Sequence, residues 1–132
     1  SDVKVTAILS ARNSDYLLSR EKFERIGAEI HPVVDTDGSS SVDSVGAIIE
    51  RLVAEGRADA FYTCGSNRLF KLMKDIGRRH GIPGQVAMEQ IMACGLGPCY
   101  VCVKTFEVDG EKVLRRVCIE GPVFDMQEAM GW

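Results

Sequence analysis

Short apolar runs alternate with amphipathic stretches from residue 3 to about residue 92. Four runs are rich in β-branched residues or alternate between apolar and polar positions, which predicts β-strands: residues 3–9, 28–34, 58–64 and 85–92. In three other stretches apolar residues recur every three or four positions, which predicts helices: residues 15–26, 45–53 and 69–76. Alternating strands and helices typically form a parallel sheet with helices on both faces, so the pattern predicts an α/β fold.

Single residues refine this prediction. Pro32 cannot donate a hydrogen bond to a strand ladder, so residues 28–34 are expected at a sheet edge. Ser19 is a potential break in the first helix. Gly56 and Gly81 each follow a helical stretch, at a position where glycine often ends a helix.

Beyond the fourth predicted strand, two strand-like runs at residues 102–108 and 112–118 flank Asp109-Gly110. An Asp-Gly pair between two such runs is a strong signal for a β-hairpin. The chain shows no internal repeat and no long linker. We therefore expect residues 1–90 to form the α/β part, and residues 91–132 to form a small β-rich module that packs directly against it.

Composition and charge exclude several kinds of partner. The 132 residues are 45% hydrophobic and 27% charged, with a formal net charge of −3 and no block of Lys and Arg. This balance gives no sign of binding to nucleic acid or to an anionic membrane. No apolar run approaches the roughly eighteen residues of a membrane-spanning helix, and no secretory leader is seen. Because no Ser-His-Asp or paired-carboxylate constellation is visible, we assign no catalytic residue.

Four of the five cysteines crowd into the last third of the chain: Cys94, Cys99, Cys102 and Cys118. Three thiols spaced C-x4-C-x2-C, with a fourth farther on, form the plant-type arrangement for a [2Fe–2S] cluster. Gly95 and Gly97 can take positive φ and let backbone N–H groups turn toward sulfur. Pro98 then fixes φ just before the second ligand. The motif therefore predicts a cluster held by these four thiolates.

A four-cysteine zinc site and a set of disulfides remain open as alternatives. Zinc ribbons usually carry two matched C-x2-C pairs, whereas only Cys99 and Cys102 form such a pair here. A secreted disulfide framework is not indicated, because the number of cysteines is odd and they are unevenly spread. The expected compartment is a reducing cytoplasm. A zinc-stabilised binding module without a redox role is the alternative from a different functional class.

Residues 92–102 and 117–124, together with Trp132, resemble the C-terminal cluster domain of the electron-transfer subunit of class B dihydroorotate dehydrogenase. The preceding chain is similar to the later half of that subunit's ferredoxin-reductase-like nucleotide lobe. The resemblance covers essentially the whole chain, although only the cysteine motif is specific. It implies a partial lobe over residues 1–90 and a [2Fe–2S] module over residues 91–132.

The resemblance also implies that parts of the family's fold are missing. A lobe of this kind begins with a strand and a Gly-rich phosphate loop, whereas this chain begins at what matches the second strand. The flavin-binding barrel that precedes the lobe is also absent. We therefore expect a fragment that is not catalytically competent alone, and whose open strand edges make it self-associate.

An electron relay is the function that the resemblance implies. Electrons would pass between NAD(H), FAD, the [2Fe–2S] cluster and the FMN of a catalytic partner that oxidises dihydroorotate to orotate in pyrimidine biosynthesis. The chain would thus be part of an oxidoreductase. Related flavin subunits of a hydrogenase, sulfide dehydrogenase or transhydrogenase are the alternatives within this class.

Four residues are candidates for contacts with a nucleotide: Arg12, Cys64, Gly65 and Ser66. The last three follow a predicted strand and open a helix, where backbone N–H groups can face a phosphate or a nicotinamide ring. Family lobes carry Cys-Gly-Pro there, so Ser66 in place of Pro is a departure. The alternative for Cys64 is an inert buried thiol, and for Arg12 a solvated surface side chain.

Apolar residues in the cysteine loop are candidates for a docking face: Leu96, Pro98, Tyr100 and Val101. An electron relay should expose such groups so that a partner flavoprotein can approach closely. Packing of the same residues inside the module is the alternative.

Overall fold

The computed structural model describes residues 3–131. Its contacts divide the chain into two compact units, Ser1–Ile48 and Ile49–Trp132. Helix α2 (Val42–Ala54) begins in the first unit and ends in the second. The predicted boundary between an α/β part at residues 1–90 and a β-rich module at residues 91–132 stays a prediction. Trp132, which contributes to the sequence resemblance, lies outside the described residues.

The first unit is built on two parallel strands. Its elements are β1 (Thr6–Ala11), η1 (Ser14–Tyr16), α1 (Arg20–Arg25), β2 (Glu29–Val34) and η2 (Asp35–Asp37). The predicted break in the first helix is confirmed, since Ser19 takes a φ of 65° between η1 and α1. Among the described strands β2 pairs only with β1, and Pro32 lies opposite Leu9. The edge position predicted from Pro32 is therefore also confirmed.

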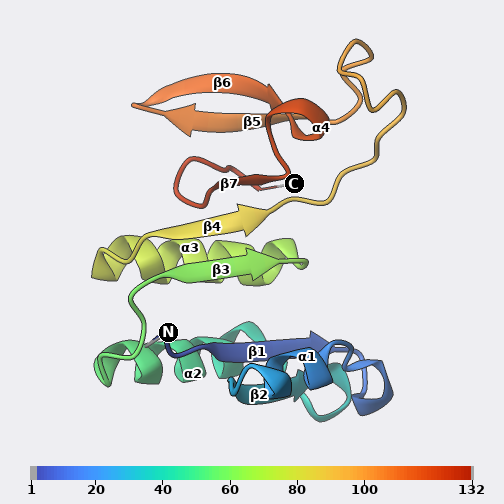
Figure 1. Cartoon of the computed structure of the whole chain (residues 1–132). Helices are drawn as coiled ribbons and strands as arrows, with labels where there is room; N and C mark the ends of the chain where they lie inside the picture. The colour runs from blue at the N-terminus through green and yellow to red at the C-terminus, as the bar shows by residue number, and fades with distance from the viewer. Residues whose placement is uncertain (1–2, 132) are drawn as a thin grey trace. The chain divides into compact units, whose positions relative to one another are not determined.

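The second unit contains a three-stranded sheet covered by α3 (Asn67–His80), which lies along β3 and β4 (Figure 1). The strands are β3 (Phe61–Cys64), β4 (Gly84–Ala87) and β7 (Val123–Asp125). β3 and β4 are parallel, as predicted, and β7 joins β4 in antiparallel fashion. Phe70 and Ile76 of α3 are fully buried, and Gly81 ends the helix with a φ of 67°.

Two sequence predictions need correction in this sheet. The fourth strand ends at Ala87 and not at residue 92: the Met88 N–H still donates to the Pro122 carbonyl at 2.9 Å, but Pro122 has no N–H to continue the ladder. The strand β7 was not predicted. Close packing explains the glycine at the start of β4, since a Cβ on Gly84 would lie 2.7 Å from Met126 Cε.

The predicted hairpin is confirmed as β5 (Val103–Val108) and β6 (Glu111–Arg116). Asp109 and Gly110 both have positive φ, which suits the tight turn between twisted strands. Phe106 of β5 is fully buried and packs against Phe124 of β7, with ring centroids 4.5 Å apart. The hairpin therefore packs directly on the sheet, as expected. Cys118 is not in the second strand of the hairpin but in the short helix α4 (Val117–Glu120).

The parallel strands form two pairs, β1–β2 and β3–β4, that share no hydrogen bonds with each other. Among the described strands, β1 and β3 each have one neighbour and therefore one open edge. Self-association through these edges stays a prediction.

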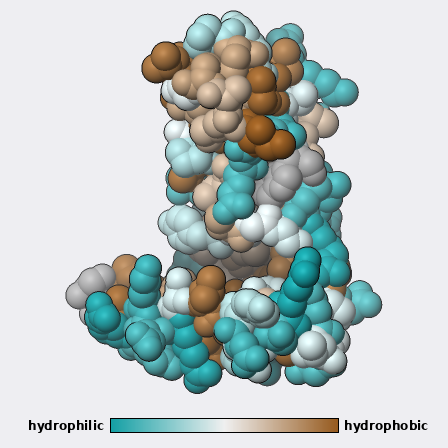
Figure 2. Space-filling view, turned by 90° about the vertical axis from the view of Figure 1, so that its right-hand side faces the viewer, coloured by the Kyte–Doolittle hydropathy of each residue, from teal (hydrophilic) through white to brown (hydrophobic). Residues whose placement is uncertain are grey.

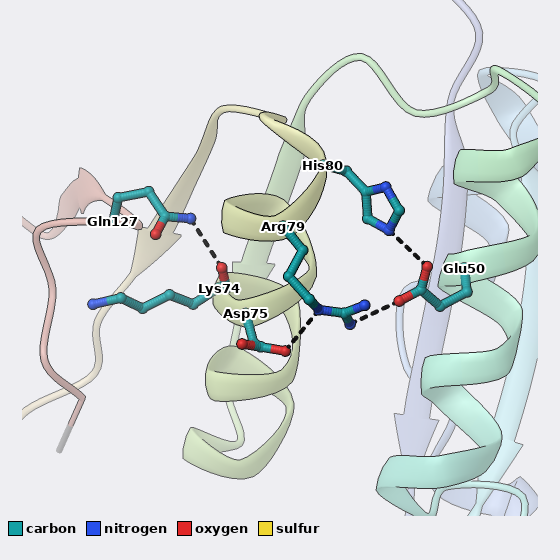
Figure 3. Close-up of polar contacts among 6 residues, drawn as sticks. All are labelled: Glu50, Lys74, Asp75, Arg79, His80 and Gln127. Carbon is teal, nitrogen blue, oxygen red and sulfur yellow. Dashed lines mark hydrogen bonds and ion pairs between the residues drawn. The ribbon is translucent and has the colours of Figure 1, made fainter.

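A group of exposed ion pairs links the end of α2 to α3 within the second unit (Figure 3). Glu50 contacts Arg79 at 2.7 Å and His80 at 2.8 Å, and Arg79 also contacts Asp75 at 3.0 Å. Such exposed pairs contribute little to stability individually. His80 is one of the two residues of α3 that contact Glu50 in this group.

Candidate metal centre

One pair of thiols lies where the two ends of the hairpin meet. Cys102 Sγ is 3.2 Å from Cys118 Sγ, and the Val117 N–H donates to the Cys102 carbonyl at 3.2 Å. Cys102 is buried and Cys118 is partly buried. Because β5 follows Cys102 directly and β6 ends just before Cys118, the hairpin fixes the separation of these two sulfurs.

Hydrogen bonds make the two thiols of this pair unequal. The backbone N–H of Cys118 and then its side chain lower the pKa of Cys102. The hydrogen bond with Cys102 is the main reason that the pKa of Cys118 is raised. Cys102 is therefore the group that becomes a thiolate first, and thiolates are the ligands that iron and zinc require.

The other pair of thiols, Cys94 and Cys99, lies in the stretch between β4 and β5. The Cys99 side chain is the largest of the contacts that lower the pKa of Cys94 to about 7; backbone N–H groups, including that of Leu96, add to it. The Leu96 N–H lies 3.4 Å from Cys94 Sγ. Gly95 and Gly97 take φ of 63° and 97°, which only glycine adopts readily. The predicted inward turn of backbone N–H groups toward sulfur is thus confirmed.

The thiols are arranged as two pairs and not as one cluster. Among residues 3–131 no group of three or more His, Cys, Asp or Glu is positioned to hold a single metal ion. A zinc site brings four ligands to one ion, whereas a [2Fe–2S] cluster divides its four ligands between two irons. Two separate thiol pairs on one module therefore fit a dinuclear cluster better than a zinc ion.

Two residues beside the cysteines were not predicted to belong to the site. Arg116 reaches the Gly97 carbonyl, and Glu120 accepts a hydrogen bond of 2.6 Å from the Arg116 N–H. Because both residues lie far from the cysteine loop in the sequence, local sequence patterns do not reveal this contact. Only the position of Arg116, two residues before Cys118, could have drawn attention to it.

Exposed apolar side chains surround the thiols. Leu96 is 80% exposed, Tyr100 59%, Val101 48% and Ile119 50%. Figure 2 shows hydrophobic residues gathered over the end of the second unit that carries the hairpin and the cysteine loop. The expectation that the apolar loop residues are exposed is confirmed, and the alternative that they pack inside the module is wrong.

The candidate nucleotide residues lie in different units. Cys64 ends β3 and is exposed, which contradicts the alternative of a buried thiol. Gly65 has a φ of 111°, and Ser66 directly precedes α3, with its carbonyl accepting the Phe70 N–H at 3.0 Å. Arg12 is exposed just after β1 in the first unit. The three residues at the end of β3 thus share one strand-to-helix turn, as predicted.

No helix formed by the described residues combines the length and the apolar character needed to cross a membrane.

Comparison with known proteins identifies the cysteine segment. Residues 89–129 match the family model described as the iron–sulfur cluster binding domain of dihydroorotate dehydrogenase B. This match includes all four paired cysteines and the whole hairpin.

Curated relatives match over nearly the whole chain. The electron transfer subunit of dihydroorotate dehydrogenase B (NAD(+)) from Enterococcus faecalis is 32% identical over 131 residues, which is 97% of this chain and 49% of the relative. A probable subunit of the same name from Methanocaldococcus jannaschii is 32% identical over 123 residues, covering 92% of this chain and 45% of the relative. The chain thus spans about half the length of the curated relatives that it matches.

A solved structure supports the same assignment. The NADH-dependent reduced ferredoxin–NADP oxidoreductase, solved in a study of flavin-based electron bifurcation, aligns with a TM-score of 0.71 and 28% identity over 96% of this chain and 44% of that one. The predicted α/β, reductase-like fold with an iron–sulfur segment is therefore confirmed. Residues 89–129 thus resemble an iron–sulfur cluster binding domain, and nearly the whole chain is similar to about half of the electron transfer subunits of dihydroorotate dehydrogenase B.

Proposed function

We propose that Cys94, Cys99, Cys102 and Cys118 hold a [2Fe–2S] cluster through which the chain passes electrons. The observation that carries this proposal is the arrangement of the thiols in two pairs, inside the segment that matches a cluster-binding domain. When bound, such a cluster accepts and donates single electrons. Backbone N–H groups directed at Cys94 and Cys102 stabilise the thiolates that hold it.

The chain would act within an electron-transfer subunit of dihydroorotate dehydrogenase B. Electrons would pass between NAD(H), FAD and the FMN of the catalytic partner, which oxidises dihydroorotate in pyrimidine biosynthesis. Similarity to subunits of that name over 97% of the chain supports this role. Five free cysteines, two of them exposed, suit the reducing cytoplasm in which we place the protein.

The strand-to-helix turn at Cys64, Gly65 and Ser66 would contribute to the nucleotide site. It is exposed at the carboxyl end of β3, which is the end where α/β sheets bind ligands. Arg12, also at the carboxyl end of a parallel strand, would contact the adenosine part of a nucleotide. The binding of NADH by variants Arg12→Ala and Ser66→Pro in the full-length subunit tests these assignments.

A ferredoxin-linked reductase subunit is the second candidate. The structural alignment with the NADH-dependent reduced ferredoxin–NADP oxidoreductase favours it. The two candidates differ in partner: one predicts a complex with an FMN-containing dihydroorotate dehydrogenase chain, and the other predicts electron exchange with ferredoxin. Stopped-flow reduction of the cluster by each partner separates them.

Single Cys→Ser variants test the four ligands. Because a hydroxyl cannot replace a thiolate at iron, each change at Cys94, Cys99, Cys102 or Cys118 should sharply reduce bound iron and sulfide. Cys64→Ser is the matched control and should keep both. Stoichiometric zinc without visible absorption in anaerobically purified protein would establish the zinc-stabilised module instead. Full iron in Cys118→Ser with loss in Cys64→Ser would overturn the ligand assignment.

The exposed rim around the thiols would receive the catalytic partner. Tyr100→Asp places a charge on this rim and should weaken co-purification of the full-length subunit with a dihydroorotate dehydrogenase catalytic chain. Tyr16→Asp is the control, because Tyr16 is similarly exposed but belongs to the first unit. Equal complex formation by both variants would remove the loop from the interface.

A further inference from the structure

Arg116 contacts the loop of the first thiol pair from the strand that leads to the second pair. It is the last residue of β6, two positions before Cys118. Its guanidinium group donates to the Gly97 carbonyl at 3.4 Å and lies 5.3 Å from the centre of the Tyr100 ring. Gly97 lies between Cys94 and Cys99, and Tyr100 directly follows Cys99. One side chain thus contacts both sides of the second cysteine of the loop.

Glu120 fixes the direction of this side chain. One carboxylate oxygen, Glu120 Oε2, accepts the backbone N–H of Arg116 at 2.6 Å and lies 3.6 Å from its Nε. Arg116 and Glu120 therefore flank Cys118 on both sides and hold one another. Because Arg116 also reaches Gly97, it connects the segments that carry the two thiol pairs.

The fit around Gly97 indicates that the contact is close. A Cβ at this position would lie 3.0 Å from Ile119 Cγ1 and 3.3 Å from the Arg116 guanidinium, and the φ of 97° also favours glycine. The loop backbone therefore approaches Arg116 and α4 as nearly as a residue without a side chain allows. The hydrogen bond from the Arg116 guanidinium to the Gly97 carbonyl then restrains the loop between its two cysteines.

Charge gives Arg116 a second effect. Four thiolates and two sulfides give a [2Fe–2S] centre a negative charge that increases on reduction, and nearby charge is one of the factors that set its potential. A guanidinium group stays charged at every pH that the protein tolerates. Its side chain is only 33% exposed, so water screens the charge incompletely. The negative charge of the Glu120 carboxylate has the opposite effect, because it disfavours reduction of the cluster.

We propose that Arg116 is a positioning residue for the cluster site, which holds the Cys94–Cys99 loop against the segment of Cys118 and favours the reduced state by its charge. The inference rests on the proposed function, because it requires the four thiolates to hold a [2Fe–2S] cluster. Glu120 is the counterpart that orients Arg116 and offsets part of its charge.

Four variants of the full chain separate position from charge. Arg116→Gln removes the charge, and Arg116→Lys keeps it but loses the planar group that stacks on Tyr100. Glu120→Gln removes the opposing carboxylate and retains an amide oxygen as acceptor. Arg115→Gln is the matched control, because Arg115 pairs with Glu128 at 2.7 Å and lies over Phe106, away from the cysteine loop.

The measurements are the midpoint potential of the cluster and the rate of iron loss to a chelator. Arg116→Gln should lower the potential and Glu120→Gln should raise it, whereas Arg116→Lys should restore the wild-type potential. Both Arg116 variants should lose iron about tenfold faster than wild type, which is the usual effect of removing a residue that orients metal ligands. Arg115→Gln should change neither quantity.

Two different failures can be told apart. A wild-type chain that contains no [2Fe–2S] cluster by iron analysis and visible spectrum would refute the proposed function itself. A normal cluster in wild type, with the same potential and the same rate of iron loss in both Arg116 variants, would refute only the role of Arg116. If Arg116→Gln and Glu120→Gln shifted the midpoint potential in the same direction, the proposal that these residues act on the cluster through their charges would be refuted.

Discussion

The two thiol pairs have different supports. Cys102 and Cys118 lie at the ends of a hairpin whose core residue, Phe106, is fully buried. Cys94 and Cys99 lie in residues 88–102, which form no helix or strand and are largely exposed. Backbone packing thus sets the geometry of one pair before any metal binds. The geometry of the other pair depends on positive-φ glycines and on contacts such as that of Arg116.

This difference indicates how the site can be both stable and accessible. In the proposed site, the pair at the ends of the hairpin would fix the position of the cluster, while the exposed loop would keep the other edge of the cluster close to the surface. Leu96 and Tyr100 extend that edge outward. In the proposed function, electron transfer to a partner would need this short approach, whereas retention of the cluster would need the buried pair.

The largest effect should come from breaking the support of the rigid pair. Phe106→Ala removes a fully buried ring that packs on Phe124, and we expect a loss of about 3–5 kcal/mol in the free energy of unfolding. Urea denaturation measures it. Leu114→Ala on β6 is the control and should stay within about 0.5 kcal/mol, because Leu114 is 69% exposed. Equal stability of the two variants would show that the hairpin core does not support the site.

A smaller and more local effect should follow from changing the loop. Gly97→Ala forces a side chain into a φ of 97° and against Ile119, which costs about 1–2 kcal/mol of local strain. We expect reduced iron content and a loss of at most about 1–2 kcal/mol in the free energy of unfolding of the metal-free chain, measured with urea.

The control for this change is a glycine with similar backbone and no neighbours. Gly110→Ala lies in the hairpin turn, where φ is 82° and a Cβ would meet nothing within 4 Å. It should lower stability slightly and leave the iron content unchanged. If Gly110→Ala lost as much iron as Gly97→Ala, backbone strain alone and not the contact with α4 would explain the result.

Most regular elements followed from local patterns. The helices have one apolar face and end at glycines such as Gly81, and the hairpin turn requires the positive φ that Asp109-Gly110 supplies. The cysteine spacing predicts the four ligands Cys94, Cys99, Cys102 and Cys118, and this assignment stays a prediction. These features depend on residues that are near one another in the sequence.

The features that escaped prediction depend on contacts between distant residues. The strand β7 has three residues, too few to show a period. It depends on its pairing with β4, which is flanked by hydrogen bonds from the Met126 N–H to the Gly84 carbonyl and from the Met88 N–H to the Pro122 carbonyl. The short helix α4 is similarly brief. The division of the four thiols into two pairs and the contact of Arg116 with Gly97 also arise only when the hairpin brings its ends together.

The smallest effect should be a difference in thiol reactivity after the metal is removed. In the metal-free chain the pKa of Cys94 is lowered to about 7, mainly by the Cys99 side chain, whereas the pKa of Cys118 is raised. A thiolate and not a thiol reacts with iodoacetamide. Alkylation of Cys94 should therefore rise through about pH 7 and then level off, while Cys118 stays mostly protonated and reacts appreciably only at higher pH.

Site-resolved mass spectrometry of the chelator-treated chain measures both rates. Cys99→Ala should move the profile of Cys94 to higher pH, because it removes the largest cause of the lowered pKa and leaves the N–H of Leu96 in place. The same variant should change the profile of Cys118 much less, since the shift of its pKa comes first from Cys102 and only in smaller part from the charge of Cys94. Identical profiles for Cys94 and Cys118 in the unaltered chain would mean that the thiols do not form two separate pairs in solution.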